Sequence, residues 1–280
     1  MYPIIEKKTI APSTIQMVIQ APRVAKKILA GQFIILRPFA DSERIPLTCA
    51  NAEPDAGTVT VIFQTVGVTT RELASLEVGE ALCDLVGPLG KASLLDTAKR
   101  VLCIGGGVGA AVVFPQVKML HQRGAHVDVI IGARSKEFVI LEDEIRANCT
   151  NLYITTDDGS YVRKGFVTDV AQELLSLGNQ YDEVLAIGPA VMMRAVVNVT
   201  RQFGVKTTVS LNPIMVDGTG MCGGCRVTVG GKTMYACVDG PDFDGFEVEF
   251  DELMLRQRMY REEEAEMNEK HPCGGAYHGR

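Results

Sequence analysis

Short runs of apolar and β-branched residues, separated by turn residues, fill the first 97 positions of the chain. Such runs favour strands, and no stretch in this part has the apolar period of a long helix. Several short strands at this spacing predict a small antiparallel barrel or sandwich over residues 1–97. The predicted strands are Ile4–Ile10, Ile15–Gln20, Gln32–Leu36, Thr58–Gln64 and Glu80–Val86.

The pattern changes at Arg100, where apolar runs begin to alternate with segments of helical length. Val101–Ile104 leads into a glycine-rich turn and then into a helix that ends near Gly124. This alternation predicts a doubly wound parallel sheet over residues 98–212. The other predicted strands are Val127–Ile131, Leu152–Thr155, Val184–Ile187 and Thr207–Leu211, and the other predicted helices are Leu141–Asn148, Asp169–Leu177 and Pro189–Phe203.

Residues 213–250 form a third, small unit of glycine- and cysteine-rich loops, with short strands expected at Arg226–Val229 and Thr233–Ala236. At the start of the last unit, residues 251–280, apolar positions from Phe250 to Tyr260 are spaced for one helix face. The sequence then becomes highly charged. The pattern is equally compatible with packing of this stripe on the chain's own body and with docking on a partner.

Composition narrows the function classes. The 34 acidic residues outnumber the 28 basic ones, so the chain lacks the basic excess that nucleic-acid binding requires. The longest apolar stretch, Val101–Phe114, is interrupted by glycines and is shorter than the ~18 residues of a membrane span. The first residues do not have the charged-then-apolar order of a secretion signal. We therefore expect a cytoplasmic protein that binds neither nucleic acid nor a membrane.

A cluster of potential metal ligands lies in the third unit. Asp217 is followed after four residues by Cys222, after two more by Cys225 and after eleven more by Cys237. With cysteine at the first position, this spacing would match the plant-type [2Fe–2S] arrangement, and the glycines between the ligands allow close approach of the backbone. Zinc bound by three cysteines and one aspartate is the alternative. The spacing does not decide whether Asp217 is a metal ligand or only caps the loop. Cys273 lies too far along the chain to take its place as the fourth ligand.

A glycine-rich turn between the first strand and the first helix of the parallel sheet is a candidate nucleotide site. Amide groups at a helix N-terminus can hold a pyrophosphate in this context, and glycine allows the backbone to come close. The turn consists of Gly105, Gly106, Gly107, Val108 and Gly109.

Two further segments end strands at the same predicted sheet edge. Gly188 and Pro189 open another helix after the fourth strand, and Asp157 and Asp158 follow the third strand. Ligands of doubly wound sheets bind at this edge, so we expect these residues beside the nucleotide.

The preference between NAD and NADP stays open. Asp128 stands about 20 positions after the turn, where an acidic residue would bind the ribose of NAD, but it is equally explained as a strand residue. Arg134 and Lys136 would suit the 2′-phosphate of NADP, or they are ordinary surface charges.

The β domain contains two candidate segments for a second nucleotide. Residues 44–48 provide a guanidinium at Arg44 and a hydroxyl at Thr48. Residues 67–73 predict a turn that enters a helix, with Thr69 and Glu72 in capping-box spacing. On spacing alone, an ordinary loop and an ordinary helix cap explain both segments better.

Together these motifs resemble the ferredoxin–NADP reductase superfamily, in which a β-barrel FAD domain precedes a nicotinamide domain. The third unit resembles the branch that holds the electron-transfer subunit of dihydroorotate dehydrogenase and the small subunit of NADH-dependent reduced ferredoxin:NADP oxidoreductase. The stretches that carry the resemblance are ERIPLT, GGGVGAAVVFP, DDGS, DGTGMCGGCRV, YACVDGPDFDG and ELMLRQRMY.

The resemblance implies roles for individual residues. Arg44 would contact the FAD pyrophosphate, Leu47 would lie against the flavin, and Thr48 would lie near its N5 atom, with Pro46 in the same segment. The second FAD phosphate loop would be Gly67, Thr69 and Thr70, and the glycine turn and Gly188 would bind the nicotinamide nucleotide. The dihydroorotate branch has cysteine where this chain has Asp217, and in this respect the chain resembles the small subunit of the ferredoxin:NADP oxidoreductase.

The implied activity is electron transfer by an oxidoreductase subunit. NADH would give a hydride to FAD, and single electrons would pass to a [2Fe–2S] cluster; NADP(H) is not excluded. The resemblance also implies a larger flavin and iron–sulfur subunit related to the glutamate synthase small subunit, contact with ferredoxin through the complex, and electron bifurcation. The alternatives are the electron-transfer subunit of an NAD-dependent dihydroorotate dehydrogenase and a non-catalytic, zinc-bearing nucleotide-binding protein.

Overall fold

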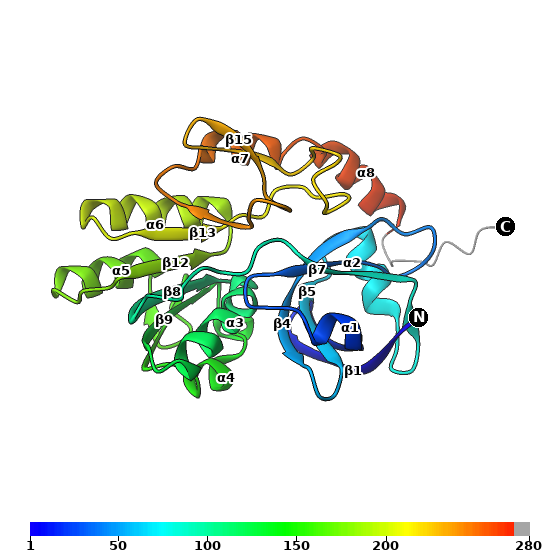
Figure 1. Ribbon diagram of the computed structural model, residues 1–280, viewed down its shortest axis with the longest axis horizontal. Coiled ribbons are helices and arrows are strands. Elements are labelled where there is room, and N and C mark those ends of the chain that lie inside the picture. The colour runs from blue at the N-terminus through cyan, green and yellow to red at the C-terminus, as the bar shows by residue number, and fades with distance from the viewer. Residues whose placement is uncertain (272–280) are drawn as a thin grey trace.

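The computed structural model describes residues 1–271 of the chain. The first strands form one antiparallel sheet in the order β6-β1-β2-β5-β4-β3-β7, which curls into the predicted barrel (Figure 1). Side chains such as Met17, Ile19 and Val61 fill its core. The elements are β1 Tyr2–Ala11, β2 Thr14–Gln20, α1 Pro22–Ala25, β3 Phe33–Arg37, β4 Ile45–Glu53, β5 Thr58–Gln64, α2 Val68–Ser75, β6 Ala81–Leu82 and β7 Asp84–Leu89.

Strand β4 is absent from the sequence-based prediction, which treats its first residues as a loop. Its polar residues and Pro46 give it no clear apolar alternation. Its pairing with β3, where Pro46 lies opposite Ile35, makes it a strand.

The second sheet has the order β11-β10-β9-β8-β12-β13-β16 and is parallel except at β16. On β8, Val101 and Cys103 pack with helix α3, whereas Leu102 and Ile104 face the core that contains α5 and α6. Helices therefore cover both faces, which confirms the doubly wound arrangement. The elements are β8 Arg100–Gly106, α3 Gly109–Gln122, β9 His126–Ala133, η1 Lys136–Phe138, α4 Glu142–Arg146, β10 Asn151–Thr156, β11 Arg163–Lys164, α5 Val167–Ser176, β12 Glu183–Ile187, α6 Ala190–Gln202 and β13 Thr207–Ser210.

The cysteine-rich unit contains the predicted hairpin of β14 (Arg226–Val229) and β15 (Lys232–Tyr235). It also adds β16 (Asp242–Asp244) to the edge of the parallel sheet by antiparallel pairing with β13. A strand of three residues, two of them aspartates, has no recognisable sequence pattern. The pairing ties this unit to the nucleotide-binding sheet.

The predicted C-terminal helix is two helices, α7 (Phe250–Arg256) and α8 (Arg261–Lys270). Phe250 and Leu253 are buried in the same core as the cysteine-rich unit, so the apolar stripe packs in part on the chain's own body. Helix α8 lies above the barrel (Figure 1). No helix within residues 1–271 combines the length and the apolar character needed to cross a membrane.

Candidate functional site

The barrel has an interrupted hydrogen-bond ladder between β4 and β5. Residues Cys49–Glu53 of β4 pair with β5, whereas Ile45–Thr48 pair with β3. Residues Ile62–Gln64 of β5 pair with β2, and β4 does not continue alongside them. We call the opening between Ile45–Thr48 and Ile62–Gln64 the seam.

Both candidate FAD segments border the seam. Arg44 is exposed directly before β4, and Pro46, Leu47 and Thr48 are half-buried in its first part. Leu47 lies opposite Ile34 and packs against the barrel core, whereas Thr48 lies opposite Phe33 and uses the other face. An apolar side chain and a hydroxyl therefore flank the same strand edge.

The second segment begins α2. Gly67 is the N-cap, and its amide donates a hydrogen bond of 2.9 Å to the hydroxyl of Thr70. The predicted capping box of Thr69 and Glu72 is wrong, because α2 starts two residues earlier than that spacing requires. Thr69 is buried and Thr70 is half-buried beside the N-cap.

Glu72 instead joins the two segments. Its buried carboxylate accepts a hydrogen bond of 2.7 Å from the hydroxyl of Ser42, and the Ser42 hydroxyl accepts one of 3.1 Å from the Phe39 amide. The loop that leads to Arg44 is thus attached to α2. The sequence analysis missed this role, because Ser42 and Glu72 are 30 residues apart.

The nucleotide turn and the Gly188–Pro189 turn touch at the carboxyl edge of the parallel sheet. A Cβ atom on Gly109 would overlap the carbonyl oxygen of Ile187, and a Cβ on Gly188 would lie 3.3 Å from the Cα atom of Gly106. The two predicted nucleotide segments therefore form one site. Met192 of α6 covers both turns, because its side chain would collide with a Cβ on either Gly106 or Gly188. The sequence contains no signal for this role of Met192.

Asp157 and Asp158 lie at the same edge. The amide of Asp157 donates to the Ala133 carbonyl oxygen at 3.0 Å, and the amide of Asp158 donates to that of Arg134 at 3.2 Å. Hydrogen bonds from the Ser160 hydroxyl and amide hold the pKa of the Asp158 carboxyl below its usual range. Asp158 therefore shapes this turn, and Arg134 is exposed beside it.

Asp128 lies at the other end of the sheet. It is the third residue of β9 and 2% exposed, and it accepts hydrogen bonds of 2.6 Å from the Tyr181 hydroxyl and 2.8 Å from the Asn151 amide. Burial and the bond to Asp128 raise the pKa of Tyr181. The interpretation of Asp128 as a ribose ligand is wrong, because the glycine turn lies at the opposite edge.

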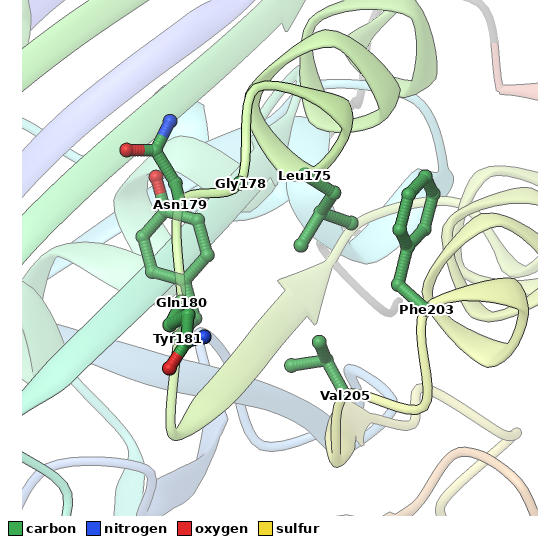
Figure 2. Close-up of a pocket in the computed structure, with 7 residues that line it drawn as sticks. All are labelled: Leu175, Gly178, Asn179, Gln180, Tyr181, Phe203 and Val205. Carbon is green, nitrogen blue, oxygen red and sulfur yellow. The ribbon is translucent and has the colours of Figure 1, made fainter.

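A shallow pocket lies at the same end of the sheet as Asp128, where α5 and α6 end (Figure 2). Leu175, Tyr181, Phe203 and Val205 line it. It is separate from the glycine turns, since Tyr181 precedes β12, whereas Gly188 follows the carboxyl end of that strand.

Two of the candidate metal ligands meet in the interior of the cysteine-rich unit. The sulfur atoms of Cys225 and Cys237 are 3.1 Å apart, and both residues are buried. Burial and the contact with Cys225 raise the pKa of the Cys237 thiol to about 12, while the Gly220 amide opposes this shift. Metal binding would therefore release protons from this pair.

Asp217 and Cys222 complete the candidate ligand set from the loop. The Asp217 carboxylate accepts hydrogen bonds from the amides of Thr219 (2.5 Å) and Cys222 (2.8 Å). Cys222 is exposed, and its sulfur accepts a hydrogen bond of 3.4 Å from the Gly224 amide. Within residues 1–271, no three such side chains converge as around a single metal ion. Cys273 lies outside the described residues.

The cysteine loop touches the strand next to the seam. A Cβ on Gly218 would lie 2.5 Å from Ile35 and 3.0 Å from Leu89, both on barrel strands. Ile35 and Phe33 belong to the same buried core as Cys225 and Cys237. Since Ile35 lies opposite Pro46, the loop packs on β3, the strand that pairs with the part of β4 that borders the seam.

Comparisons with known proteins agree with this arrangement. Residues 212–249 match the iron–sulfur cluster binding domain of dihydroorotate dehydrogenase B. The chain is 44% identical to a Thermotoga maritima homologue of the electron transfer subunit of dihydroorotate dehydrogenase B (NAD(+)), over 93% of this chain and 92% of that one. It is 32% identical to this subunit of Fusobacterium nucleatum, over 88% and 96% of the two chains.

Solved structures extend the comparison. The structure of an NADH-dependent reduced ferredoxin-NADP oxidoreductase, studied for flavin-based electron bifurcation, matches with a TM-score of 0.91 and 42% identity over 96% of this chain and 97% of that one. Phthalate dioxygenase reductase matches with a TM-score of 0.61 and 15% identity over 81% and 85% of the two chains. The second match concerns the fold alone.

Proposed function

This chain belongs to the family of the electron transfer subunit of dihydroorotate dehydrogenase B and its homologues, and from that premise we propose that it is the small subunit of an electron-bifurcating NADH-dependent reduced ferredoxin:NADP oxidoreductase. The observation that carries the proposal is the match of nearly the whole chain to that enzyme's structure, at 42% identity. The chain thus passes electrons between NAD(H), FAD and a [2Fe–2S] cluster as an oxidoreductase subunit.

Each cofactor has its own unit. Bound FAD would supply the conversion of a two-electron hydride donor into the single electrons that a [2Fe–2S] cluster accepts. We assign residues 1–97 to FAD, 98–212 to the nicotinamide nucleotide and 213–250 to the cluster, with 251–280 as a C-terminal extension. The first sheet ends at Leu89 and the second begins at Arg100, which supports the limit between the first two units.

The two nucleotide-binding regions would hold FAD and NAD(H) through backbone and side-chain groups of this chain. At the seam, Leu47 provides an apolar edge and Thr48 a hydroxyl, and the positive dipole end at the start of α2 would favour the phosphates of FAD. At the parallel sheet, the glycine turn and Pro189 place two further helix N-termini at one edge. NADP(H) stays a possible ligand, because Arg134 is exposed at this edge.

Arg44 is the proposed ligand of the FAD pyrophosphate. Replacing Arg44 by alanine should weaken FAD binding by about 10- to 100-fold, since a hydrogen bond from a charged group contributes ~1.5–3 kcal/mol. Titration of the apoprotein with FAD, followed by flavin fluorescence, measures the change. The matched control is Arg163→Ala, which removes a guanidinium paired with Glu173 on the nucleotide unit. Unchanged FAD affinity in Arg44→Ala would remove Arg44 from the site.

Asp217 is the proposed fourth ligand of the cluster, beside Cys222, Cys225 and Cys237. Its carboxylate accepts a hydrogen bond of 2.8 Å from the Cys222 amide, which places it beside another member of the ligand set. Asp217→Cys should retain the cluster and lower its midpoint potential, because thiolate releases more electron density to iron than carboxylate does. Redox titration followed by electron paramagnetic resonance measures this potential.

The control for that variant is another carboxylate of the same unit. Asp239 accepts a hydrogen bond of 2.8 Å from the Tyr235 amide, so Asp239→Asn changes a charge and a loop contact near the cluster. Because this control removes a negative charge, it should not lower the potential. If Asp217→Cys does not lower it either, Asp217 is only a cap of the loop.

An exposed apolar surface around the cysteine loop supports a larger partner subunit. Met221 is 88% exposed and Leu255 is 71% exposed. The Arg256 side chain donates to the Gly224 carbonyl oxygen at 3.1 Å, so α7 lies against the loop. Exposed apolar patches of this kind mark protein interfaces. We propose that a flavin and iron–sulfur subunit related to the glutamate synthase small subunit binds here and connects the chain to ferredoxin.

Co-purification tests the proposed function. A tagged chain isolated from its own cells should bring down a flavoprotein with further iron–sulfur clusters, and the complex should couple NADH and reduced ferredoxin to NADP reduction. We expect this complex in the cytoplasm, where the free thiols of residues 1–271 stay reduced. Full activity of the isolated chain without a partner would contradict the subunit role.

The second candidate is the electron-transfer subunit of a dihydroorotate dehydrogenase. The names of the relatives at 44% and 32% identity favour it. The co-purifying chain separates the candidates, because this alternative requires a partner that oxidises dihydroorotate. Dihydroorotate-dependent reduction of NAD by the complex would establish the second candidate.

A further inference from the structure

The C-terminal arm, defined as residues 257–271, ends in a helix with little to stabilise it alone. Helix α8 has no buried residues, and three consecutive glutamates occupy its first turn. Isolated helices shorter than ~12–15 residues are marginal in water, so a helix of this length depends on contacts with the rest of the protein. Figure 1 shows α8 turned back over the barrel, above α2.

One guanidinium joins this arm to the start of α2. Arg71 Nη2 donates hydrogen bonds to Asn268 Oδ1 at 2.6 Å and to the carbonyl oxygen of His271 at 3.2 Å. Its Nη1 atom reaches the carbonyl oxygen of Val66, next to the N-cap residue Gly67, at 3.5 Å. The same side chain therefore touches both the arm and the segment assigned to the FAD phosphates.

The Arg71 side chain is held mainly by these contacts. Its Nε atom is buried and has no hydrogen-bond partner among the described residues. Arg71 is half-buried, and without the arm its guanidinium would lack two hydrogen-bond acceptors. The arm therefore supplies part of the hydrogen bonding that this charged group needs. Loss of the Asn268 acceptor leaves the guanidinium free to move, and the arm loses its contact with α2.

We propose that the C-terminal arm is a latch on the FAD site, in which Asn268 positions Arg71 and thereby covers the outer side of the phosphate loop at Gly67–Thr70. This inference rests on the proposed function, since it requires FAD phosphates at the start of α2. Release of FAD then requires the arm to detach. The arm slows cofactor loss, and Asn268 is a positioning residue.

The test measures FAD release from the full-length, FAD-loaded chain, as the rise in flavin fluorescence after a large dilution into buffer that contains no FAD. Asn268→Leu, which keeps the size but removes the acceptor, should release FAD about tenfold faster, the equivalent of ~1.4 kcal/mol. Asn268→Asp keeps an acceptor for Arg71 and should release FAD as slowly as the wild type. Glu263→Ala, an exposed change on the same helix, is the matched control.

A double variant separates the latch from direct binding of FAD by Arg71. If the latch operates, Asn268→Leu adds nothing to the rate of Arg71→Ala, because both remove the same contact. Wild-type release by Asn268→Leu, or equal acceleration by Asn268→Asp and Glu263→Ala, would overturn the proposal. A chain that binds no FAD would instead contradict the proposed function, so the two failures are distinguishable.

Discussion

Replacing Cys225 by alanine should remove the iron–sulfur cluster while FAD stays bound. The Cys225 sulfur lies 3.1 Å from that of Cys237 in a buried position, so the loss of one thiolate cannot be compensated by solvent. Removing even an outer-sphere partner weakens metal sites by about 10- to 100-fold, and loss of a ligand should exceed this range. FAD should remain, because the seam residues belong to barrel strands.

Iron, acid-labile sulfide and FAD are measured in the same preparation, together with the paramagnetic signal after reduction by dithionite. The control is Cys149→Ala, which removes a half-buried thiol of the nucleotide unit. This control should keep its iron and its signal. A Cys225→Ala protein with the full content of iron and sulfide, or a wild-type protein with equimolar zinc and no sulfide, would contradict the cluster assignment.

Replacing Gly109 by alanine should strongly weaken NADH binding without removing either FAD or the cluster. The new Cβ would overlap the Ile187 carbonyl oxygen and lie 2.9 Å from its carbonyl carbon, so α3 must move away from β12. Overpacking of this kind costs about 1–3 kcal/mol and displaces backbone amides at the nucleotide turn. We expect NADH affinity to fall by about 10- to 100-fold, since each ~1.4 kcal/mol is tenfold.

Two measurements isolate the effect on the nucleotide. NADH-dependent flavin reduction is followed by stopped flow, and dithionite reduction of the same variant should stay normal. Gly124→Ala is the control at the other end of α3, where φ is +78° and a Cβ would meet no atom within 4 Å. This control introduces backbone strain just after the same helix but leaves the glycine turn intact. Wild-type NADH affinity in Gly109→Ala would show that the turn does not bind the nucleotide.

Much of the fold could be predicted because its signals are local. The alternation of strands and helices after Arg100 predicts the parallel sheet, and the structure confirms it. The short strands of the first 97 residues likewise predict the barrel, although β4 was missed. The glycines within residues 105–109 predicted a turn. The structure shows why position 109 needs glycine, because its backbone lies in close contact with Ile187.

Other features depend on residues far apart in the chain and have no local signal. Asp128 has the right distance in sequence from the glycine turn, yet it lies at the wrong end of the sheet among Tyr181 and Asn151. Glu72 has the spacing of a helix cap, yet it binds Ser42. In each case a long-range partner, rather than the spacing, decided the position of the side chain.

The sequence by itself determined the order of the units, the periods of their strands and helices, and the spacing of the aspartate and cysteines, because these are properties of neighbouring residues. Only the tertiary structure decided that the β4–β5 ladder stops at Cys49, that Gly218 lies against Ile35, and that Arg71 meets Asn268. Strand register and contacts between units depend on how distant surfaces pack together, and a one-dimensional pattern does not contain that information.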